Sequence, residues 1–251
     1  MGVGVIVVCA AALVGTAGAA ASERTVFGHS VEGRQLVAVH SGAADPAVTV
    51  LVVGAIHGNE AAGMPIARRL VAAGAPRGAE LWVVPTLNPD GVAAGTRGNA
   101  HGVDLNRNFP FDWRPLGGGE YSGPQALSEP ESRAGLRLIR RIQPDLTIWF
   151  HQPFGLVDAS GNQPEVERRF ADLAGLPLDH LRGPYPGSAS RWQNHAFPDA
   201  TAFVAELPAI VSPALTRRAA TAVRTLAAEL ASPAVSGRRA KHSGVRRRGY
   251  I

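Results

Sequence analysis

Four apolar runs along the chain predict strands of a buried sheet. Each is almost continuously hydrophobic, which is typical of a strand covered on both faces rather than on one. The runs are Val48–Ile56, Leu81–Leu87, Leu146–Phe150 and Thr201–Ala205, and Gln35–His40 is a further candidate nearer an edge.

Segments with helical patterns alternate with these runs and predict an α/β sandwich with a largely parallel or mixed sheet. Gly74 is a candidate C-cap for the first helix, and Ser128 with Glu131 has the spacing of a capping box. Ser212 precedes a proline that suits the first turn of the last helix. The predicted helices are Ala61–Ala73, Ser128 to about Ile142, Pro164–Leu173 and Ser212 to about Ala231.

The two ends of the chain differ from the part between them. Val3–Ala21 is apolar and ends in small residues, so we predict a secretory signal at 1–21 that is cleaved near Ala21, with a membrane anchor as the alternative. We expect one folded domain at 22–232 and a basic tail at 233–251. The single cysteine, Cys9, lies in the first segment, so a mature chain would hold a metal through His and carboxylates only.

The formal charge of +5 comes from the tail. Residues 237–251 contain six basic residues and no acid, and the remaining 19 basic and 20 acidic residues leave about −1. We expect this tail to be a solvated, disordered end, and the functional alternative is weak association with anionic surfaces. Nucleic acid is not an expected partner, because no recognition motif accompanies the tail.

Histidine and glutamate follow three of the apolar runs. His57 and Glu60 come directly after the first run, His151 follows Phe150, and Glu206 follows Ala205. A buried carboxylate is costly unless it is paired or functional, and ligands of open α/β sheets bind at the carboxyl ends of strands. Two histidines and a carboxylate with one open position are typical of a catalytic zinc site.

A polar loop between residues 97 and 110 carries further candidates. It contains two arginines, three asparagines and one aspartate, and a planar guanidinium is well suited to a carboxylate. An alternative interpretation is a hydrogen-bonded surface loop. The preceding Asn88-Pro89-Asp90-Gly91 predicts a turn.

These motifs, taken in order, resemble the zinc carboxypeptidase family, the carboxypeptidase A-like group. The resemblance rests on His57-Gly-Asn-Glu60, Asn88-Pro-Asp-Gly91, Gly102-Val-Asp-Leu-Asn-Arg-Asn-Phe109, Ser128-Glu-Pro-Glu131, His151 and Glu206-Leu207. It implies a three-layer sandwich, with a central mixed, largely parallel twisted sheet and helices on both faces.

The resemblance also implies a metal centre with one Zn²⁺ per chain. His57, Glu60 and His151 would be the zinc ligands, Glu206 the general base, and Asp104 the partner that orients His57 through a hydrogen bond.

Four more positions match substrate-handling residues of the family. Arg97 would stabilise the oxyanion, while Asn106 and Arg107 would hold the substrate's terminal carboxylate. Tyr185 is the candidate for the family's mobile substrate-binding tyrosine, although its spacing to Ser188 is shorter than in the pancreatic enzymes.

The compact chain and the His151-Gln152-Pro153 continuation are most similar to bacterial murein tripeptide amidases, which cleave the γ-D-glutamyl–diaminopimelate bond of cell-wall peptides. We therefore expect a secreted or wall-associated monomeric carboxypeptidase acting on a peptide or cell-wall peptide. Arg191, in the region where the terminal side chain should bind, could meet an acidic group or could be a surface residue. The alternatives are an aspartoacylase-like amidohydrolase and a zinc- or peptide-binding protein without turnover.

Overall fold

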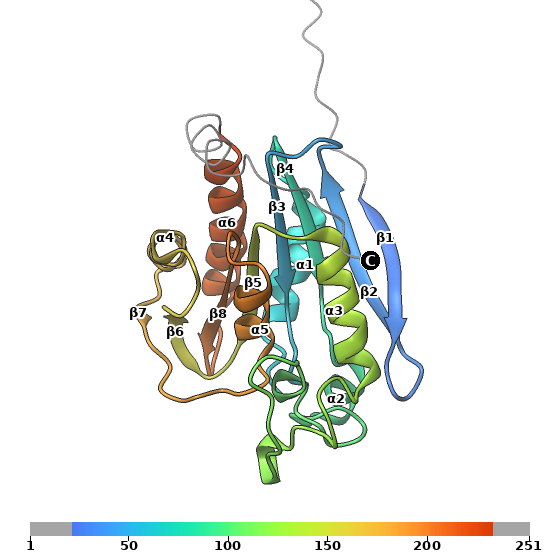
Figure 1. Cartoon of the computed structure of the whole chain (residues 1–251). Coiled ribbons are helices and arrows are strands. Elements are labelled where there is room, and N and C mark those ends of the chain that lie inside the picture. Colours follow the sequence, from blue (N-terminus) through green and yellow to red (C-terminus); the bar gives the residue numbers. More distant parts are fainter. Residues whose placement is uncertain (1–21, 233–251) are drawn as a thin grey trace, which may run out of the picture.

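The computed structural model describes residues 22–232, so the predicted signal, Cys9 and the basic tail lie outside the described residues. Within this range, one mixed sheet has the strand order β1-β2-β4-β3-β5-β8-β6-β7 (Figure 1). The strands are β1 Glu23–His29, β2 Gln35–Gly42, β3 Val48–Val53, β4 Ala79–Val84, β5 Leu146–His151, β6 Phe154–Asp158, β7 Leu178–Asp179 and β8 Thr201–Pro208. The helices are α1 Gly63–Ala73, α2 Pro89–Ala94, α3 Pro130–Ile142, α4 Pro164–Ala174, α5 Ala189–Ala196 and α6 Pro213–Leu230, with short 3₁₀ turns η1 Leu105–Arg107 and η2 Gly118–Glu120.

The four predicted apolar runs form the parallel centre of the sheet, β4-β3-β5-β8. Antiparallel pairs flank it on both sides, β1 and β2 at one edge and β6 against β8 at the other. The predicted fold class is therefore confirmed. Two runs extend beyond their strands, because the apolar residues up to Ile56 and Leu87 are buried in the loops that follow β3 and β4.

Alternate residues of the central strands belong to two hydrophobic cores, one on each face of the sheet. Val50 and Val52 belong to the core that α1, α4 and α6 also line, whereas Leu51 and Val53 belong to the core that α3 and α5 also line. This alternation is the expected consequence of the two-residue repeat of a strand. It produces the three layers visible in Figure 1.

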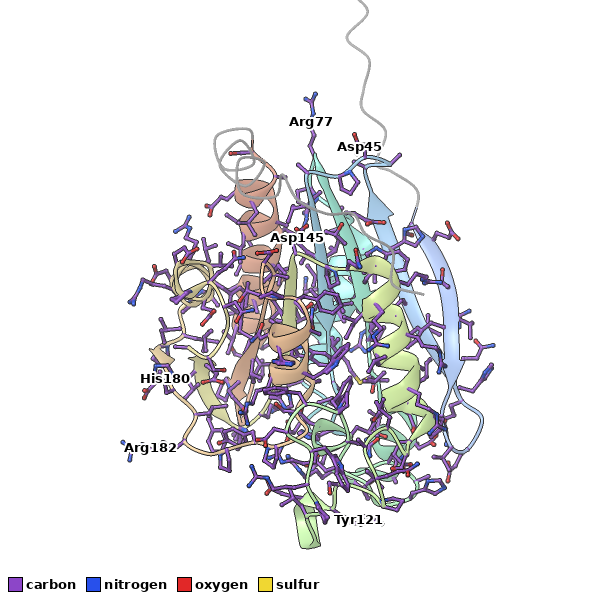
Figure 2. The ribbon with its side chains drawn as sticks, in the orientation of Figure 1. Asp45, Arg77, Tyr121, Asp145, His180 and Arg182 are labelled. Atoms are coloured by element: carbon purple, nitrogen blue, oxygen red, sulfur yellow. The ribbon has the colours of Figure 1, made fainter. Side chains whose placement is uncertain are left out.

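The carboxyl ends of the parallel strands share one end of the molecule with the long loops. Asp45 and Arg77, which precede β3 and β4, lie at the opposite end from Tyr121 in the loop after η2 (Figure 2). Strand β3 lies between β4, the next strand along the chain, and β5. The direction in which successive strands are added to the sheet therefore reverses at β3. Open α/β sheets bind their ligands at such a point.

The start of α3 differs from the prediction. Ser128 is not the cap of α3, which begins at Pro130 after Glu129 and has no side-chain cap. The Ser128 hydroxyl instead donates to Glu129, and Glu131 accepts a hydrogen bond from the amide of Val31, because both side chains serve loop contacts.

The Asn88-Pro-Asp-Gly91 turn opens the short helix α2, with Asn88 as its N-cap. The predicted caps Gly74 and Ser212 are both confirmed. None of the helices in residues 22–232 combines the length and the hydrophobicity that a membrane crossing requires.

Candidate metal centre and active site

Three side chains converge where β3 and β5 end. His57 Nδ1 lies 3.0 Å from Oε1 of Glu60, and His151 Nδ1 lies 2.9 Å from Oε2 of the same carboxylate. One ligand atom from each residue falls within 4.8 Å of the others. Two imidazole nitrogens and a carboxylate are a ligand set that zinc prefers, so this group could bind one zinc ion.

The orientation of His57 also fits a metal ligand. Its Nε2 lies 2.9 Å from Oδ1 of Asp104, which turns Nδ1 toward Glu60. Within the described chain, this buried Nδ1 makes no well-aligned hydrogen bond. A carboxylate behind a ligating histidine sets its tautomer and raises its basicity. Burial lowers the pKa of His57, but the charge and hydrogen bond of Asp104 outweigh burial and raise it. A metal would therefore compete with a proton here.

The other two ligands are already in their metal-binding forms. Burial lowers the pKa of His151 below its ordinary value, so the imidazole is neutral. Burial alone would raise the pKa of Glu60, but hydrogen bonds with His151 and His57 outweigh it and lower the pKa. A neutral imidazole and an ionised carboxylate are the species that coordinate zinc.

Glu206 lies directly beside this group. It is opposite His151 in the parallel pairing of β5 and β8. Burial, followed by the negative charge of Glu60, raises its pKa to about 7. Its Oε2 is buried and has no hydrogen-bond partner among the described residues. A carboxyl group poised near neutral pH with a free oxygen is suited to general base chemistry.

Arg97 connects the metal ligand Glu60 with Asp104, the hydrogen-bond partner of His57. Its Nη1 donates to Glu60 at 2.8 Å and its Nε donates to Asp104 at 2.9 Å. Burial would raise the pKa of Asp104, but the charges of His57 and Arg97 and the hydrogen bond from His57 lower it. Asn99, in the same loop, donates to Glu129 and Glu131. These carboxylates lie away from the metal group, so the Ser128–Glu131 motif anchors the loop that presents Arg97.

Asn106 and Arg107 line the same pocket. The amide oxygen of Asn106 accepts a hydrogen bond from Ala189 N, which leaves its Nδ2 facing His151 at 3.5 Å. The Arg107 side chain is buried and lies under the ring of Tyr185, with its guanidinium carbon 5.2 Å from the ring centre. The Tyr185 hydroxyl donates to the carbonyl of Arg182 at 2.9 Å. The predicted site residues are therefore brought together, Tyr185 included.

The cavity that these residues line has a volume of about 570 Å³. It also contains side chains to which the sequence motifs assigned no role. Glu120 pairs with Arg107, Asp158 lies on the sheet side of the cavity, and the buried Ser188 hydroxyl has no partner among the described residues. Only the register of β6 and the path of the loops bring Glu120 and Asp158 here, so no local sequence signal could have found these two, whereas Ser188 lies in the stretch after Tyr185 that the resemblance already marked.

Comparisons with known proteins agree with this geometry. A family model described as zinc carboxypeptidase matches residues 16–157. Murein peptide amidase A of Escherichia coli K12 is 36% identical over 125 residues, covering 44% of this chain and 51% of that protein. The catalytic chain of human carboxypeptidase N is 32% identical, covering 44% of this chain and 33% of that protein. The chain thus spans about half the length of the curated amidases that it matches.

Solved structures extend the likeness to the whole described domain. The murein-tripeptide amidase of Escherichia coli O157 has a TM-score of 0.67 and 28% identity, covering 84% of this chain and 94% of that one. Carboxypeptidase A of Helicoverpa armigera has a TM-score of 0.70 and 18% identity, covering 86% and 69% of the two chains. The latter is a likeness of fold alone.

Proposed function

Because this chain belongs to the zinc carboxypeptidase family, we propose that it is a zinc-dependent peptide hydrolase that cleaves an amide bond next to a free terminal carboxylate. The observation that carries the proposal is the convergence of His57, Glu60 and His151 beside Glu206. Arg107, on the wall of the same cavity, supplies the cation that a terminal carboxylate requires.

The protein's own groups would carry the steps of hydrolysis. When bound, zinc would lower the pKa of a water from about 15.7 toward 7 and polarise the scissile carbonyl. Glu206 would accept a proton from the attacking water at its unpaired oxygen and later give it to the leaving amine. Arg97 would stabilise the negative charge that develops on the carbonyl oxygen, and Asn106 with Arg107 would hold the terminal carboxylate.

The natural bond that we propose is the γ-D-glutamyl–diaminopimelate amide of cell-wall peptides. Similarity to murein peptide amidases supports this choice, as does a cavity wall rich in polar side chains. We further propose that the chain acts outside the cytoplasm, on the basis of the apolar segment Val3–Ala21. We propose that it acts as a monomer. We also propose that its basic tail favours anionic wall material. N-terminal sequencing of the protein recovered from the culture medium and cell envelope would test export.

Purified full-length protein tests the reaction. We expect it to release diaminopimelate from the wall tripeptide with zinc, to lose that activity with a chelator, and to regain it when zinc is restored. The matched control is the same peptide in which the carboxylate next to the scissile bond is amidated, and it should react at least tenfold more slowly. Hydrolysis of N-acetyl-aspartate alone would favour an aspartoacylase-like enzyme, and stoichiometric zinc binding without any hydrolysis would favour a binding protein.

A further inference from the structure

The cavity holds more charge than the proposed reaction uses. The metal group, Glu206 and Arg97 take part in the chemistry, and Arg107 holds the terminal carboxylate. Three charged side chains of the cavity wall remain, namely Glu120, Asp158 and Arg191. Glu120 already pairs with Arg107, so Asp158 and Arg191 are the unassigned pair.

Asp158 is a buried carboxylate at the end of β6. Because Leu156 pairs with Glu206 across the antiparallel β6 and β8, Asp158 lies two residues farther along the same face of the sheet, beside Val204. It is 6% exposed. Its oxygens accept hydrogen bonds from Leu181 N at 2.9 Å and from the Ser160 hydroxyl, which hold it in place.

No cation neutralises this carboxylate. Among residues 22–232, no Lys, Arg or His forms an ion pair with Asp158. Each carboxylate oxygen can accept more than one hydrogen bond, so both retain acceptor capacity toward the cavity. A buried charge without a counterion is costly, and a cationic group on a ligand would remove that cost.

Arg191 is a guanidinium whose charge is only loosely balanced. It lies in the first turn of α5, 3.6 Å from Asp112 and over the ring of Phe111. Its Nη1 is buried without a hydrogen-bond acceptor in the described part of the chain, while its side chain is 36% exposed. Asn162, in the loop after β6, donates to the carbonyl of Asn194 in α5 at 3.0 Å. This contact holds α5 beside the end of β6, so both charges line one cavity.

We propose that Asp158 and Arg191 select a terminal residue whose side chain carries an ammonium and a carboxylate on the same end. This inference rests on the proposed function, because it assumes that a terminal residue occupies the cavity. The ammonium would pair with Asp158, and the carboxylate would pair with the planar guanidinium of Arg191. The side chain of diaminopimelate satisfies both positions, whereas lysine or 2-aminopimelate satisfies one.

A crossed panel of variants and substrates tests the assignment. The substrates share one acyl part and end in diaminopimelate, lysine or 2-aminopimelate. Asp158→Asn should lower kcat/KM at least tenfold for the diaminopimelate and lysine substrates and less than threefold for 2-aminopimelate. Arg191→Gln should show the complementary pattern, sparing lysine. Asp172→Asn and Arg217→Gln, exposed on α4 and α6, are the matched controls.

The outcomes separate this inference from the proposed function. An equal loss of kcat/KM on all three substrates, or no loss, would show that the two side chains do not recognise the charges of the terminal side chain. Either result would overturn the inference while hydrolysis persists. Failure of the zinc-loaded wild-type protein to cleave any of the three would instead overturn the proposed function. For a substrate that turns over too slowly, the inhibition constant of the matching free amino acid replaces kcat/KM.

Discussion

Arg107 donates a hydrogen bond from Nη2 to Oε1 of Glu120, so the guanidinium expected to bind a substrate's carboxylate already holds one from this chain. The Arg107 side chain is 4% exposed and that of Glu120 is 53% exposed. Glu120 follows Gly117, Gly118 and Gly119, and glycines allow the backbone of this turn more conformations than other residues would. A substrate carboxylate would therefore compete with Glu120 for Arg107.

Replacing Glu120 by glutamine should remove this competition. We expect Glu120→Gln to lower KM about threefold to tenfold, since a partly exposed ion pair contributes on the order of 1 kcal/mol, and to leave kcat within about twofold. Steady-state kinetics on a peptide with a free terminal carboxylate measures both values. Glu165→Gln, exposed on α4, is the matched control. A raised KM would show instead that Glu120 positions Arg107 for binding.

Glu206→Gln should separate catalysis from metal binding. Glutamine keeps the shape of the side chain but cannot accept a proton from water, so we expect kcat to fall about 10²- to 10⁴-fold, the usual contribution of a general base. Zinc content, measured by atomic absorption after dialysis, should remain at one ion per chain, because Glu206 is not in the ligand group. A variant with full zinc and full activity would refute the role of Glu206.

The same substitution should stabilise the metal-free protein at alkaline pH. The folded state raises the pKa of Glu206 from 4.5 to about 7, so between these values it binds more protons than the unfolded chain does. Stability must then fall as pH rises through that window, and the full penalty applies above pH 7.

The advantage of Glu206→Gln in free energy of unfolding should therefore grow between pH 4.5 and pH 8, to on the order of 1–3 kcal/mol. Urea unfolding of both proteins at pH 5 and pH 8, with chelator present, measures this difference. An advantage that does not change with pH would show that Glu206 is not held with a raised pKa.

The central strands could be predicted because both of their faces are buried, which makes them continuously apolar. Strand β1 could not, since it lies at the sheet edge and is largely exposed. Helix α5 also escaped prediction, because its eight residues are too few to establish a periodic pattern. At the α3 start, local sequence favoured Ser128 as the cap, but Pro130 occupies the first turn and Asn108 donates to Ser128.

The metal ligands and Glu206 were predictable because their residue types are unusual at the end of a buried strand. Asp158 ends a strand too, but β6 is short and half exposed, and its place in the cavity depends on pairing with β8, which follows much later in the chain. Glu120 reaches Arg107 through the glycine turn before it. Contacts of this kind depend on the path of the whole chain rather than on a local pattern.

Asp104→Asn should weaken zinc binding. Asp104 accepts from His57 Nε2 and from Arg97, and an amide in its place cannot supply the negative charge that raises the basicity of the imidazole. We expect zinc affinity to fall about 10- to 100-fold, as for other partners of ligating histidines. Competition with a chromophoric chelator measures the affinity, and Asp172→Asn is the control. Unchanged affinity would show that His57 needs no partner.

Gly58→Ala should disrupt the metal centre through the backbone. A Cβ at Gly58 would lie 1.9 Å from the carbonyl carbon of Gly91, so the loop bearing His57 and Glu60 packs directly on α2. This contact gives a physical reason for Gly58, whereas a Cβ at Gly91 would lie 2.4 Å from Nδ2 of Asn88 and 2.5 Å from the carbonyl oxygen of Gly98.

We expect Gly58→Ala to lower the free energy of unfolding by about 3 kcal/mol or more and to weaken zinc binding. Gly117→Ala is the matched control, since Gly117 has a φ of −123° and a Cβ there would meet nothing within 4 Å; it should unfold within about 0.5 kcal/mol of wild type. Urea unfolding with and without zinc measures both effects. A Gly58→Ala protein with normal stability and zinc affinity would show that the loop can move away from α2 without displacing its ligands.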